Sequence, residues 1–392
     1  MVRPADTVTG LPRLVLLEPN DGCLTMARRL ALRGVEVVAL CPPTSAWVGR
    51  SRALREIAVG PVADGADRPW LPALTALGDR PGVLVSGSDA ASEFIATRRH
   101  EIPSALRSFE SVDGAHLALM QKDTMRAVAE EAGVRLPHTF RIDAPGDDRL
   151  VDLAVAAAPC VAKPVLGHVG RRSGDFATRL LPDADAVRGH LGAALAAGVD
   201  MLVSEEIPGP ATALEGVISL RTADGRYPLE GSRRKIRAYD HGVGSLAEAT
   251  ALPEAMALAR RLLDAANYVG LAATEFKRHA VTGELHLIEV NVRVPQNFGV
   301  YDAAGLDASW RVYATLAGLP VGEQPPAREG ARVWLPQHDL HVVRGLRRRG
   351  EITVTQAVRS LAGVRNAGVL SWRDPGPAWA VLRSEWGRLR RR

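Results

Sequence analysis

A chain of 392 residues is too long for one compact core, so we expect two or three domains. Hydrophobic residues make up 46% of it, no apolar run approaches the roughly 18 residues of a membrane span, and its start lacks a signal-like apolar block, so we expect a cytoplasmic protein without a membrane partner. The net charge of +5 permits an anionic partner, which phosphate-bearing small molecules would satisfy. Three cysteines, Cys23, Cys41 and Cys160, lack metal-ligand spacing and predict neither a zinc site nor a disulfide framework.

The first hundred residues predict an open parallel α/β sheet. A buried strand over 13–19 is followed by a helix that Gly34 closes and by a second strand over 35–40, and another strand over 82–87 leads into a helix near Asp89. Ligands of such sheets lie beyond the carboxyl ends of the strands. Here those ends carry "EPNDG" and "SGSDA", whose helix N-termini could receive a carboxylate or could simply be tight turns and caps.

The middle of the chain alternates helices with short strands. A helix begins near Lys122, with Asp123 as the expected N-cap and Gly133 as its terminator. Strands are expected in "PCVAKPVLG" and "DMLVSEEIPG", with a helix over about 184–197 between them. The later stretch "SRRKIRAYD" predicts a strand with one basic face, formed by Arg233, Lys235, Arg237 and Tyr239.

A strand over 284–294 has a polar row that needs an explanation. Its alternation places Glu289, Asn291 and Arg293 on one side, and the other side is mostly β-branched: His286, Ile288, Val290, Val292 and Val294. A three-residue loop, Val281 to Gly283, would join it to the preceding strand as a hairpin, with Gly283 in the left-handed conformation.

That hairpin predicts two opposed carboxylates. Pairing Ala280 with Glu284 places Glu275 directly opposite Glu289, an arrangement that is destabilising unless something positive lies between them. A divalent cation is the natural candidate, since magnesium takes one or two carboxylates together with water and phosphate oxygens. Asn291 adds a neutral oxygen. The alternative, a hairpin whose polar side chains merely face solvent, would rarely bring two carboxylates together.

Further cations could meet phosphates at such a metal. Lys163 ends the strand "CVAK" and precedes a loop with Gly167, Gly170 and Gly174, which could bring backbone N–H groups close to phosphate oxygens. Lys122 immediately precedes a helix. Each feature alone is weak, because a strand-ending lysine is more often a surface residue and the glycine spacing fits no standard nucleotide motif.

Taken in order, these motifs resemble the ATP-grasp superfamily over nearly the whole chain, and among its branches the carboxylate–amine ligases of the D-aspartate ligase type. The resemblance rests on "KDTMRAVAEEAGVRLPHTF", "VAKP", "LVSEEIPG", "SRRKIRAYDHGVGS" and "GLAATEFKRHAVTGELHLIEVNVR". It implies an α/β ATP-grasp fold. The implied parts are an N-terminal open parallel α/β domain over 1–115, a nucleotide-binding and catalytic region over 116–325 with a lid at about 140–208, and a short C-terminal extension over 326–392.

The resemblance also implies roles for individual residues. ATP would be bound by Lys122, Lys163, Gly167, Gly170, Glu205, Glu206 and the Ile207 backbone, with Glu215 as a guess for the ribose contact. Glu275, Glu289 and Asn291 would hold Mg²⁺, or Mn²⁺ in its place. Arg293 would bind a phosphate, and either Arg237 or Lys235 would stabilise the transferring phosphoryl group.

The implied function is an ADP-forming carbon–nitrogen ligase that makes an amide through an acyl-phosphate, with a small carboxylate or amino acid and an amine as substrates. Two alternatives are an ATP-grasp carboxylase that activates bicarbonate and a small-molecule kinase. A nucleic-acid or regulatory partner for the C-terminal arginines has little support, since Trp372, Trp379 and Trp386 are the only aromatic rings nearby. The oligomeric state is left open, with a homodimer as one option.

Overall fold

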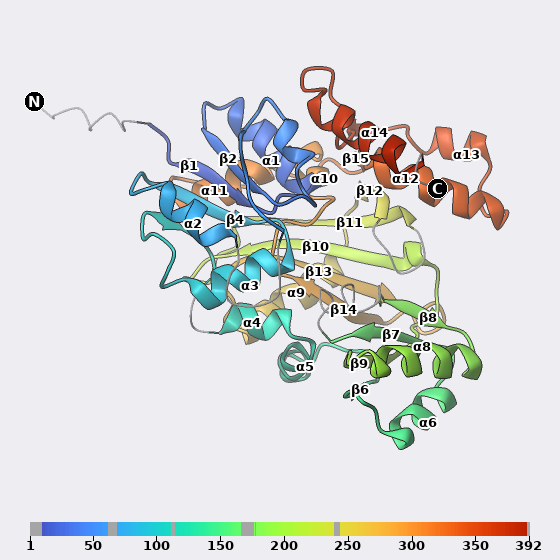
Figure 1. Ribbon diagram of the computed structural model, residues 1–392. Coiled ribbons are helices and arrows are strands. Elements are labelled where there is room, and N and C mark those ends of the chain that lie inside the picture. Colours follow the sequence, from blue (N-terminus) through green and yellow to red (C-terminus); the bar gives the residue numbers. More distant parts are fainter. Residues whose placement is uncertain are drawn as a thin grey trace, which may run out of the picture.

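The computed structural model describes residues 10–61, 69–110, 114–165, 176, 178–238 and 244–389, in which three β-sheets are flanked by helices (Figure 1). The N-terminal sheet is parallel and has the order β3 (Arg55–Ala58), β2 (Val37–Cys41), β1 (Arg13–Leu17), β4 (Gly82–Ser86), β5 (Leu106–Arg107). Its helices are α1 (Asp21–Ala31), α2 (Trp70–Ala76) and α3 (Asp89–Arg98), and η1 (Val48–Arg50) is a short 3-10 turn. The predicted open α/β domain is confirmed.

Both faces of this sheet are covered, which explains its continuous apolar strands. Leu14 and Leu16 of β1 face a core shared with the central sheet, whereas Val15 and Leu17 pack with Trp70 on the other face. The strand order reverses direction between β1 and β4. The loops after these two strands therefore meet at a topological switch point, where ligands of open α/β sheets bind.

The central sheet has seven strands in the order β14 (Leu285–Asn291), β13 (Gly270–Arg278), β10 (Leu214–Arg221), β11 (Leu229–Ala238), β12 (Gly244–Ala249), β15 (Arg332–Trp334), β16 (Val364–Asn366). All neighbours are antiparallel except β15 and β16, which are parallel. The expected C-terminal extension is thus joined to the main sheet, since it contributes the last two strands. A second core lies between this sheet and the helices α4 (Ala115–Met120), α5 (Lys122–Glu131) and α9 (Pro253–Ala265).

The third sheet is antiparallel and has the order β6 (Thr139–Ile142), β9 (Met201–Glu205), β7 (Cys160–Pro164), β8 (Arg179–Leu181). It falls within the segment expected to form a lid. The helices α6 (Asp148–Ala156) and α8 (Ala184–Ala196) pack on one face of it, and Cys160, Ala162, Met201 and Val203 point into that core. Alternation leaves Val161, Lys163, Leu202 and Ser204 on the other face.

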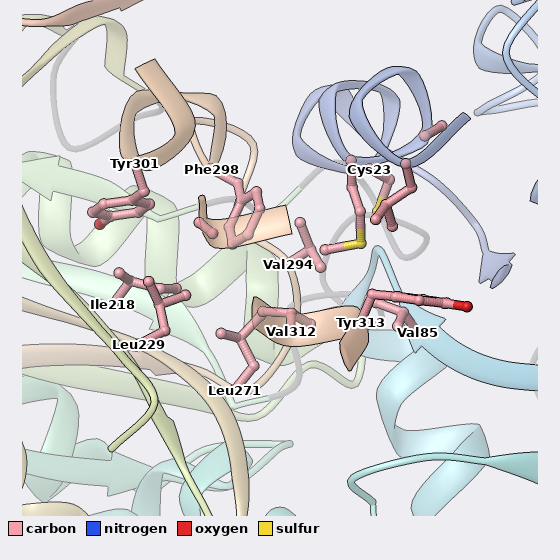
Figure 2. Packing of buried hydrophobic residues seen from close by; sticks show 14 of the residues in the cluster. Cys23, Val85, Ile218, Leu229, Leu271, Val294, Phe298, Tyr301, Val312 and Tyr313 are labelled. Carbon is pink, nitrogen blue, oxygen red and sulfur yellow. The ribbon is translucent and has the colours of Figure 1, made fainter. Parts of the chain in front are cut away.

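The largest core joins the N-terminal domain to the central sheet. Figure 2 shows Cys23 of α1 and Val85 of β4 on one side of this core and Ile218 and Leu229 of the central sheet on the other side. Helices α10 (Gly299–Ala303) and α11 (Ala308–Ala317) pack into the same core, and Val294, Phe298 and Val312 lie between its two sides. The two domains therefore share one hydrophobic core.

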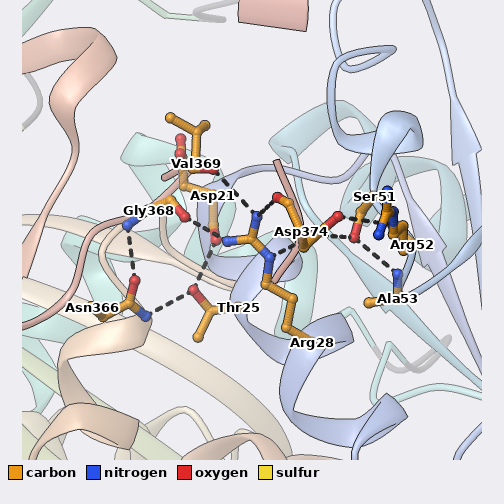
Figure 3. Close-up of polar contacts among 10 residues, drawn as sticks. All are labelled: Asp21, Thr25, Arg28, Ser51, Arg52, Ala53, Asn366, Gly368, Val369 and Asp374. Carbon is orange, nitrogen blue, oxygen red and sulfur yellow. Dashed lines mark hydrogen bonds and ion pairs between the residues drawn. The ribbon is translucent and has the colours of Figure 1, made fainter. Parts of the chain in front are cut away.

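The C-terminal extension is fastened to the N-terminal domain by polar contacts (Figure 3). Arg28 of α1 donates from Nε to Asp374 over 2.8 Å and from Nη1 to the Gly368 carbonyl over 2.6 Å. The same Asp374 carboxylate accepts from the Ser51 hydroxyl at 2.6 Å and from the Arg52 N–H at 2.9 Å. The helices of the extension are α12 (Pro336–Arg348), α13 (Val354–Arg359) and α14 (Gly376–Leu389).

Most predicted elements are present, with small differences at their ends. Gly34, Gly133 and Gly283 all have positive φ, as the predicted helix ends and hairpin require. The helix near Lys122 has Gln121 as its N-cap, so the expected Asp123 cap is wrong. In the part of the chain that the structure describes, no helix combines the length and the apolar character needed to cross a membrane.

Candidate functional site

A cavity with about 1070 Å³ of atom-free space, partly open to solvent, lies between the four-stranded sheet and the β13–β14 hairpin. Its apolar walls come from both sheets and the segments beside them, and include Leu136, Val161, Leu202, Ile207, Leu214 and Leu287. Its polar wall contains Lys163, Glu205, Glu206, Glu275, Lys277 and Glu289. An apolar slot with a few convergent charges is the usual form of a small-molecule site.

The hairpin places the two predicted carboxylates opposite each other, but the strand pairing near the turn differs from the predicted pairing. Glu275 is directly opposite Glu289, as predicted. Near the turn, however, His279 pairs with Glu284, so the loop is one residue longer than expected. A bulge between Glu275 and Phe276 compensates for this shift, because Phe276 pairs with Leu287 and leaves Ile288 as the extra residue.

The same bulge changes which side chains of β14 face the core. Val290 and Val292 point to the core beside α9, as the predicted alternation requires. Before the bulge, the odd-numbered residues of β14 face the core instead of the even-numbered ones. Leu285 and Leu287 therefore enter that core, whereas His286 pairs with Lys277 on the cavity side of the sheet. The prediction that His286 lies on the same side of the strand as Val290 and Val292 is therefore wrong.

Glu275 is neutralised by two cations of β11. Its carboxylate lies 2.5 Å from Arg233 Nη2 and 3.1 Å from Lys235 Nζ. Burial alone would raise the pKa of Glu275, but Lys235 and Arg233 outweigh it and lower the pKa to about 2. Arg233 reaches Glu275 across Gly216 of β10, where a Cβ would lie only 2.7 Å from Arg233 Cζ. Glycine at this position therefore keeps the path of the guanidinium open.

The predicted metal ligands form a set of oxygen donors of the kind that magnesium prefers. Glu275 and Glu289 are paired across the two strands, and Glu289 is exposed. Asn291 is the next residue of β14 on the same face after Glu289, and it pairs with Ala273. Among the described residues, no group of three His, Cys, Asp or Glu side chains could hold a metal by itself. The donor set fits a magnesium ion that completes its coordination with phosphate oxygens and water.

Several residues predicted to contact a nucleotide line the cavity. Lys163, Glu205, Glu206 and Ile207 lie on its wall, and the Glu205 carboxylate accepts from the His138 N–H at 3.2 Å. Lys163 reaches the cavity because β7 alternates, with Cys160 and Ala162 turned toward the helices. Gly167 and Gly170 and the side chain of Lys122 lie outside the described residues.

Lys277 is a cavity residue that the sequence analysis missed. It is 5% exposed and lies two residues beyond Glu275, on the same face of β13. Burial lowers the pKa of its ammonium, and the nearby Glu206 carboxylate opposes that shift. The signal that could have revealed it is the i, i+2 spacing within "TEFK", which places both charges on one face.

Five of the described predicted residues do not line the cavity: Glu215, Lys235, Arg237, Asn291 and Arg293. Two of them, Arg237 and Glu215, are bound by side chains elsewhere. Arg237 is 3% exposed and is bound by Asp339 of α12 through Nε at 2.8 Å and Nη2 at 2.6 Å. This partner lies 102 residues away along the chain, so the strand pattern could not reveal it. Glu215 faces the opposite side of β10 from Gly216 and Glu275, and Arg278 binds both of its carboxylate oxygens, at 2.7 and 3.1 Å.

Arg293 lies just beyond the hairpin, at the N-terminus of α3. Its Nε donates to Asp89 over 2.7 Å. Burial opposes its charge, but Asp89 holds the pKa of the guanidinium above its usual value. Arg293 therefore connects the polar face of β14 with the loop that follows β4.

Three loops that carry polar motifs meet at this point. Asn20 Nδ2 donates to the Gly87 carbonyl over 2.8 Å and to the Val294 carbonyl over 2.7 Å. Gly22 leaves no room for a Cβ, which would lie 2.2 Å from the Pro295 carbonyl oxygen. The motifs "NDG", "SGSDA" and "PQNFG" are thus joined at the switch point of the N-terminal sheet, next to Arg293.

Comparisons with models of known protein families and with curated protein sequences find no match. Solved structures do match. An N5-carboxyaminoimidazole ribonucleotide synthetase in complex with ADP has a TM-score of 0.64 and 18% identity, covering 88% of this chain and 87% of that chain. The N5-carboxyaminoimidazole synthetase from Staphylococcus aureus, complexed with ADP, has a TM-score of 0.66 and 14% identity over 88% and 87% of the two chains. The biotin carboxylase–β-γ-ATP complex from Campylobacter jejuni has a TM-score of 0.60 and 17% identity, covering 82% of this chain and 74% of that chain.

Proposed function

We propose, from the ATP-grasp fold that this chain shares with those neighbours, that the protein is an ADP-forming carbon–nitrogen ligase. ATP would phosphorylate a small carboxylate, an amine would attack the acyl-phosphate, and an amide, ADP and phosphate would leave. Phosphoryl transfer needs positioning and charge more than covalent help, so a site built from lysines, an arginine and carboxylates suits it.

The lining of the cavity would hold a nucleotide in one orientation. The base would lie between the apolar walls, with Glu205 and the Ile207 backbone at its edge, and the phosphates would lie toward Lys163 and Lys277. Glu275, Glu289 and Asn291 would hold magnesium, or manganese in its place, which neutralises phosphate charge when bound. The ribose partner stays open, because Glu215 is bound by Arg278 on the other face of the sheet.

One observation carries this proposal: Glu275, held ionised by Arg233 and Lys235, faces Glu289 in the cavity wall. Opposite charges are thereby gathered where phosphates and magnesium would lie. Lys235 is better placed than Arg237 to stabilise the transferring phosphoryl group, because Asp339 already binds Arg237 on two nitrogens. Arg293 would act from the other end of the polar row.

The acid and the amine would bind where the three loops meet at the switch point. This region supplies the N-termini of α1 and α3 and lies beside Arg293. Small carboxylates or amino acids are the proposed acid substrates, in keeping with the resemblance to ligases of the D-aspartate ligase type.

A hydroxylamine trap tests the reaction. Purified protein is incubated with ATP, magnesium, hydroxylamine and a panel of small carboxylic and amino acids, and hydroxamate, ADP and phosphate are measured. One or a few acids should give a hydroxamate and an equal amount of phosphate, and both products should disappear in Glu289→Gln. AMP and pyrophosphate as products would refute transfer of the γ-phosphoryl group to the acid. ADP together with a stable phosphorylated acid would indicate a kinase.

A carboxylase is the second candidate, and the neighbours favour it. One of them is the biotin carboxylase domain of a 2-oxoglutarate carboxylase from Hydrogenobacter thermophilus, crystallised with MgADP and bicarbonate; it has a TM-score of 0.60 and 16% identity. If bicarbonate is the acid, phosphate release should require it, and ¹⁴C from labelled bicarbonate should enter the amine product. Phosphate release that needs another acid and ignores bicarbonate would exclude this candidate.

A further inference from the structure

The C-terminal extension carries most of the large apolar side chains that are exposed in the described part of the chain. They are Leu340, Val354, Val358, Leu370, Trp372, Trp379, Leu382 and Trp386, with exposed fractions from 45% to 84%. Single exposed apolar residues are common, whereas several that lie together on one surface mark an interaction site. The nucleotide cavity does not use any of these residues.

Three of these residues form a stripe on α14. Trp379, Leu382 and Trp386 are spaced by three and four residues, which places them on one face of the helix, and they are 62%, 58% and 64% exposed. Arg383 occupies the same face between them. Gly376, at the start of the helix, packs tightly on η1, since a Cβ there would lie 2.1 Å from the Arg50 carbonyl oxygen.

A shallow hollow beside the stripe has a basic lining. Arg50, Gly376, Trp379, Ala380 and Arg383 surround it, so two guanidinium groups flank one indole ring. Arg50 is only loosely paired, because its Nη1 lies 3.7 Å from Glu56 and its side chain is 62% exposed. An anionic group could therefore reach both arginines and an apolar group could pack on Trp379.

Charge argues against a second copy of this chain as the occupant. From Arg383 to the end, the sequence has a single acidic residue, Glu385, and five arginines: Arg383, Arg388, Arg390, Arg391 and Arg392. In a symmetric dimer through α14, Arg50 and Arg383 of one copy would face the same two arginines of the other. Like charges would then oppose association.

We propose that Arg50, Trp379, Leu382, Arg383 and Trp386, together the α14 surface, bind an acidic segment of a partner protein. Its carboxylates would bind Arg50 and Arg383, and its apolar side chains would cover the two tryptophans. Tryptophan and arginine are the residues that contribute most at protein–protein interfaces. Helices that lie on membranes separate their basic and apolar faces, whereas here Arg383 lies within the apolar stripe. The proposal is independent of the proposed ligase activity.

Site-specific crosslinking in the cells that naturally produce the protein tests this surface. The photo-reactive amino acid p-benzoylphenylalanine replaces Leu382 in the full-length chain, and crosslinked peptides are identified by mass spectrometry. A matched control carries it at Leu153 of α6, which is 48% exposed and lies on another part of the molecule. We expect the Leu382 probe to capture a protein segment with net negative charge that the Leu153 probe does not capture.

The charge-reversed variant Arg50→Glu/Arg383→Glu decides whether the arginines matter. Both substitutions lie on the surface, so the melting temperature should match that of the parent protein, whereas capture should fall roughly tenfold. A basic segment, a second copy of the chain, a lipid adduct or no protein adduct at all would overturn the proposal, as would capture that the charge reversal leaves unchanged.

A direct binding measurement keeps the proposal testable outside the cell. The probe is a fluorescein-labelled peptide in which glutamates alternate with leucines, and its anisotropy is followed at low and high salt. Binding should weaken with salt and fall roughly tenfold in Trp379→Ala, while a lysine–leucine peptide should not bind. Equal binding of both peptides, or tighter binding to phosphatidylserine vesicles than to the acidic peptide, would contradict it.

Discussion

Glu275 shows how a carboxylate that is only 15% exposed stays charged in this protein. It faces another carboxylate across the hairpin, yet its pKa is lowered to about 2 because Arg233 and Lys235 contact it from the neighbouring strand. From the sequence alone, a metal ion between the two carboxylates is the expected way to relieve this repulsion. The two cations reduce the negative charge that Glu275 offers a metal, so the exposed Glu289 would be the stronger of the two carboxylate ligands.

We expect Glu289→Gln to lower magnesium-dependent turnover by roughly 100-fold while the fold stays intact. The amide removes a metal ligand and also one of two opposed carboxylates, so the free energy of unfolding should not fall. Phosphate release at fixed ATP and rising magnesium measures the effect, with circular dichroism as the control for folding. Wild-type turnover in this variant would refute the metal assignment.

Arg233→Met should destabilise the fold by roughly 1–3 kcal/mol at pH 7, because Glu275 loses its hydrogen bond to the guanidinium and keeps Lys235 as its cation partner. Since the folded pKa of Glu275 is about 2, below the ordinary 4.5, its ionisation stabilises the fold above about pH 4.5, and this contribution is lost as the pH falls toward 2. The variant should lose part of that pH dependence. Urea unfolding at pH 7 and pH 3 measures both effects.

The double variant Arg233→Met/Glu275→Gln provides the control. Because Arg233 and Glu275 contact each other, the double variant should lose less stability than the sum of the losses in Arg233→Met and Glu275→Gln measured separately. A double variant that is as unstable as the sum of its parts would show that the pair is not coupled.

At the scale of elements, alternation along strands decides which side chains meet. The four-stranded sheet turns Cys160 and Ala162 toward its helices and so turns Lys163 toward the cavity. In the hairpin, the bulge at Ile288 reverses the alternation and moves His286 to the cavity side. A period of two is readable in the sequence, but an inserted bulge residue becomes visible only when the partner strand is known.

Gly216→Ala, a change on β10, should displace the Arg233 side chain without altering any charged residue of the site. The new Cβ would lie 2.7 Å from Arg233 Cζ, so the guanidinium would have to move away from Glu275. We expect a loss of roughly 1–3 kcal/mol in stability together with reduced turnover. The matched control is Gly192→Ala in α8, where nothing lies within 4 Å and alanine should stabilise the helix by about 0.5–1 kcal/mol. Thermal unfolding of both variants measures the difference, and equal effects would refute the role of Gly216.

At the scale of the molecule, the chain has an ATP-grasp fold in which the N-terminal domain and the central sheet share a core. The C-terminal extension then ties the two together. It adds β15 and β16 to the sheet, binds Arg237 through Asp339, and binds Arg28 of the N-terminal domain through Asp374. The division at residues 115 and 325 stays a proposal about organisation, because packing crosses both positions.

Arg28→Met should loosen the extension selectively. Four hydrogen bonds to Gly368, Val369 and Asp374 would be lost, and the buried Asp374 would keep only the Ser51 and Arg52 contacts. Hydrogen exchange should rise in α14, by about tenfold or more, while β13 and β14 keep their protection. A uniform rise across the central sheet would show instead that Arg28 supports the whole fold.

The sequence by itself determined the local features that depend on neighbouring residues. Apolar strands with helix caps predicted the N-terminal parallel sheet, and the alternation with a glycine turn predicted the Glu275–Glu289 pair, which the structure confirms. The resemblance to the ATP-grasp superfamily rested on the order of several motifs, and the fold agrees with it. These features can be predicted from the sequence because hydrophobic periodicity, turn residues and motif spacing each depend on only a few neighbouring residues.

Only the tertiary structure decided which of the predicted charges share a cavity. It joins Lys163, Glu205 and Glu275 around one space and adds Lys277, whereas Arg237 is bound by Asp339. Such partners come from strands and helices distant along the chain. The residue pattern of either segment alone does not predict which side chain of the other will form the salt bridge. The physical reason is that side-chain direction follows local backbone period, while the partner that satisfies a charge is set by how the sheets and helices pack.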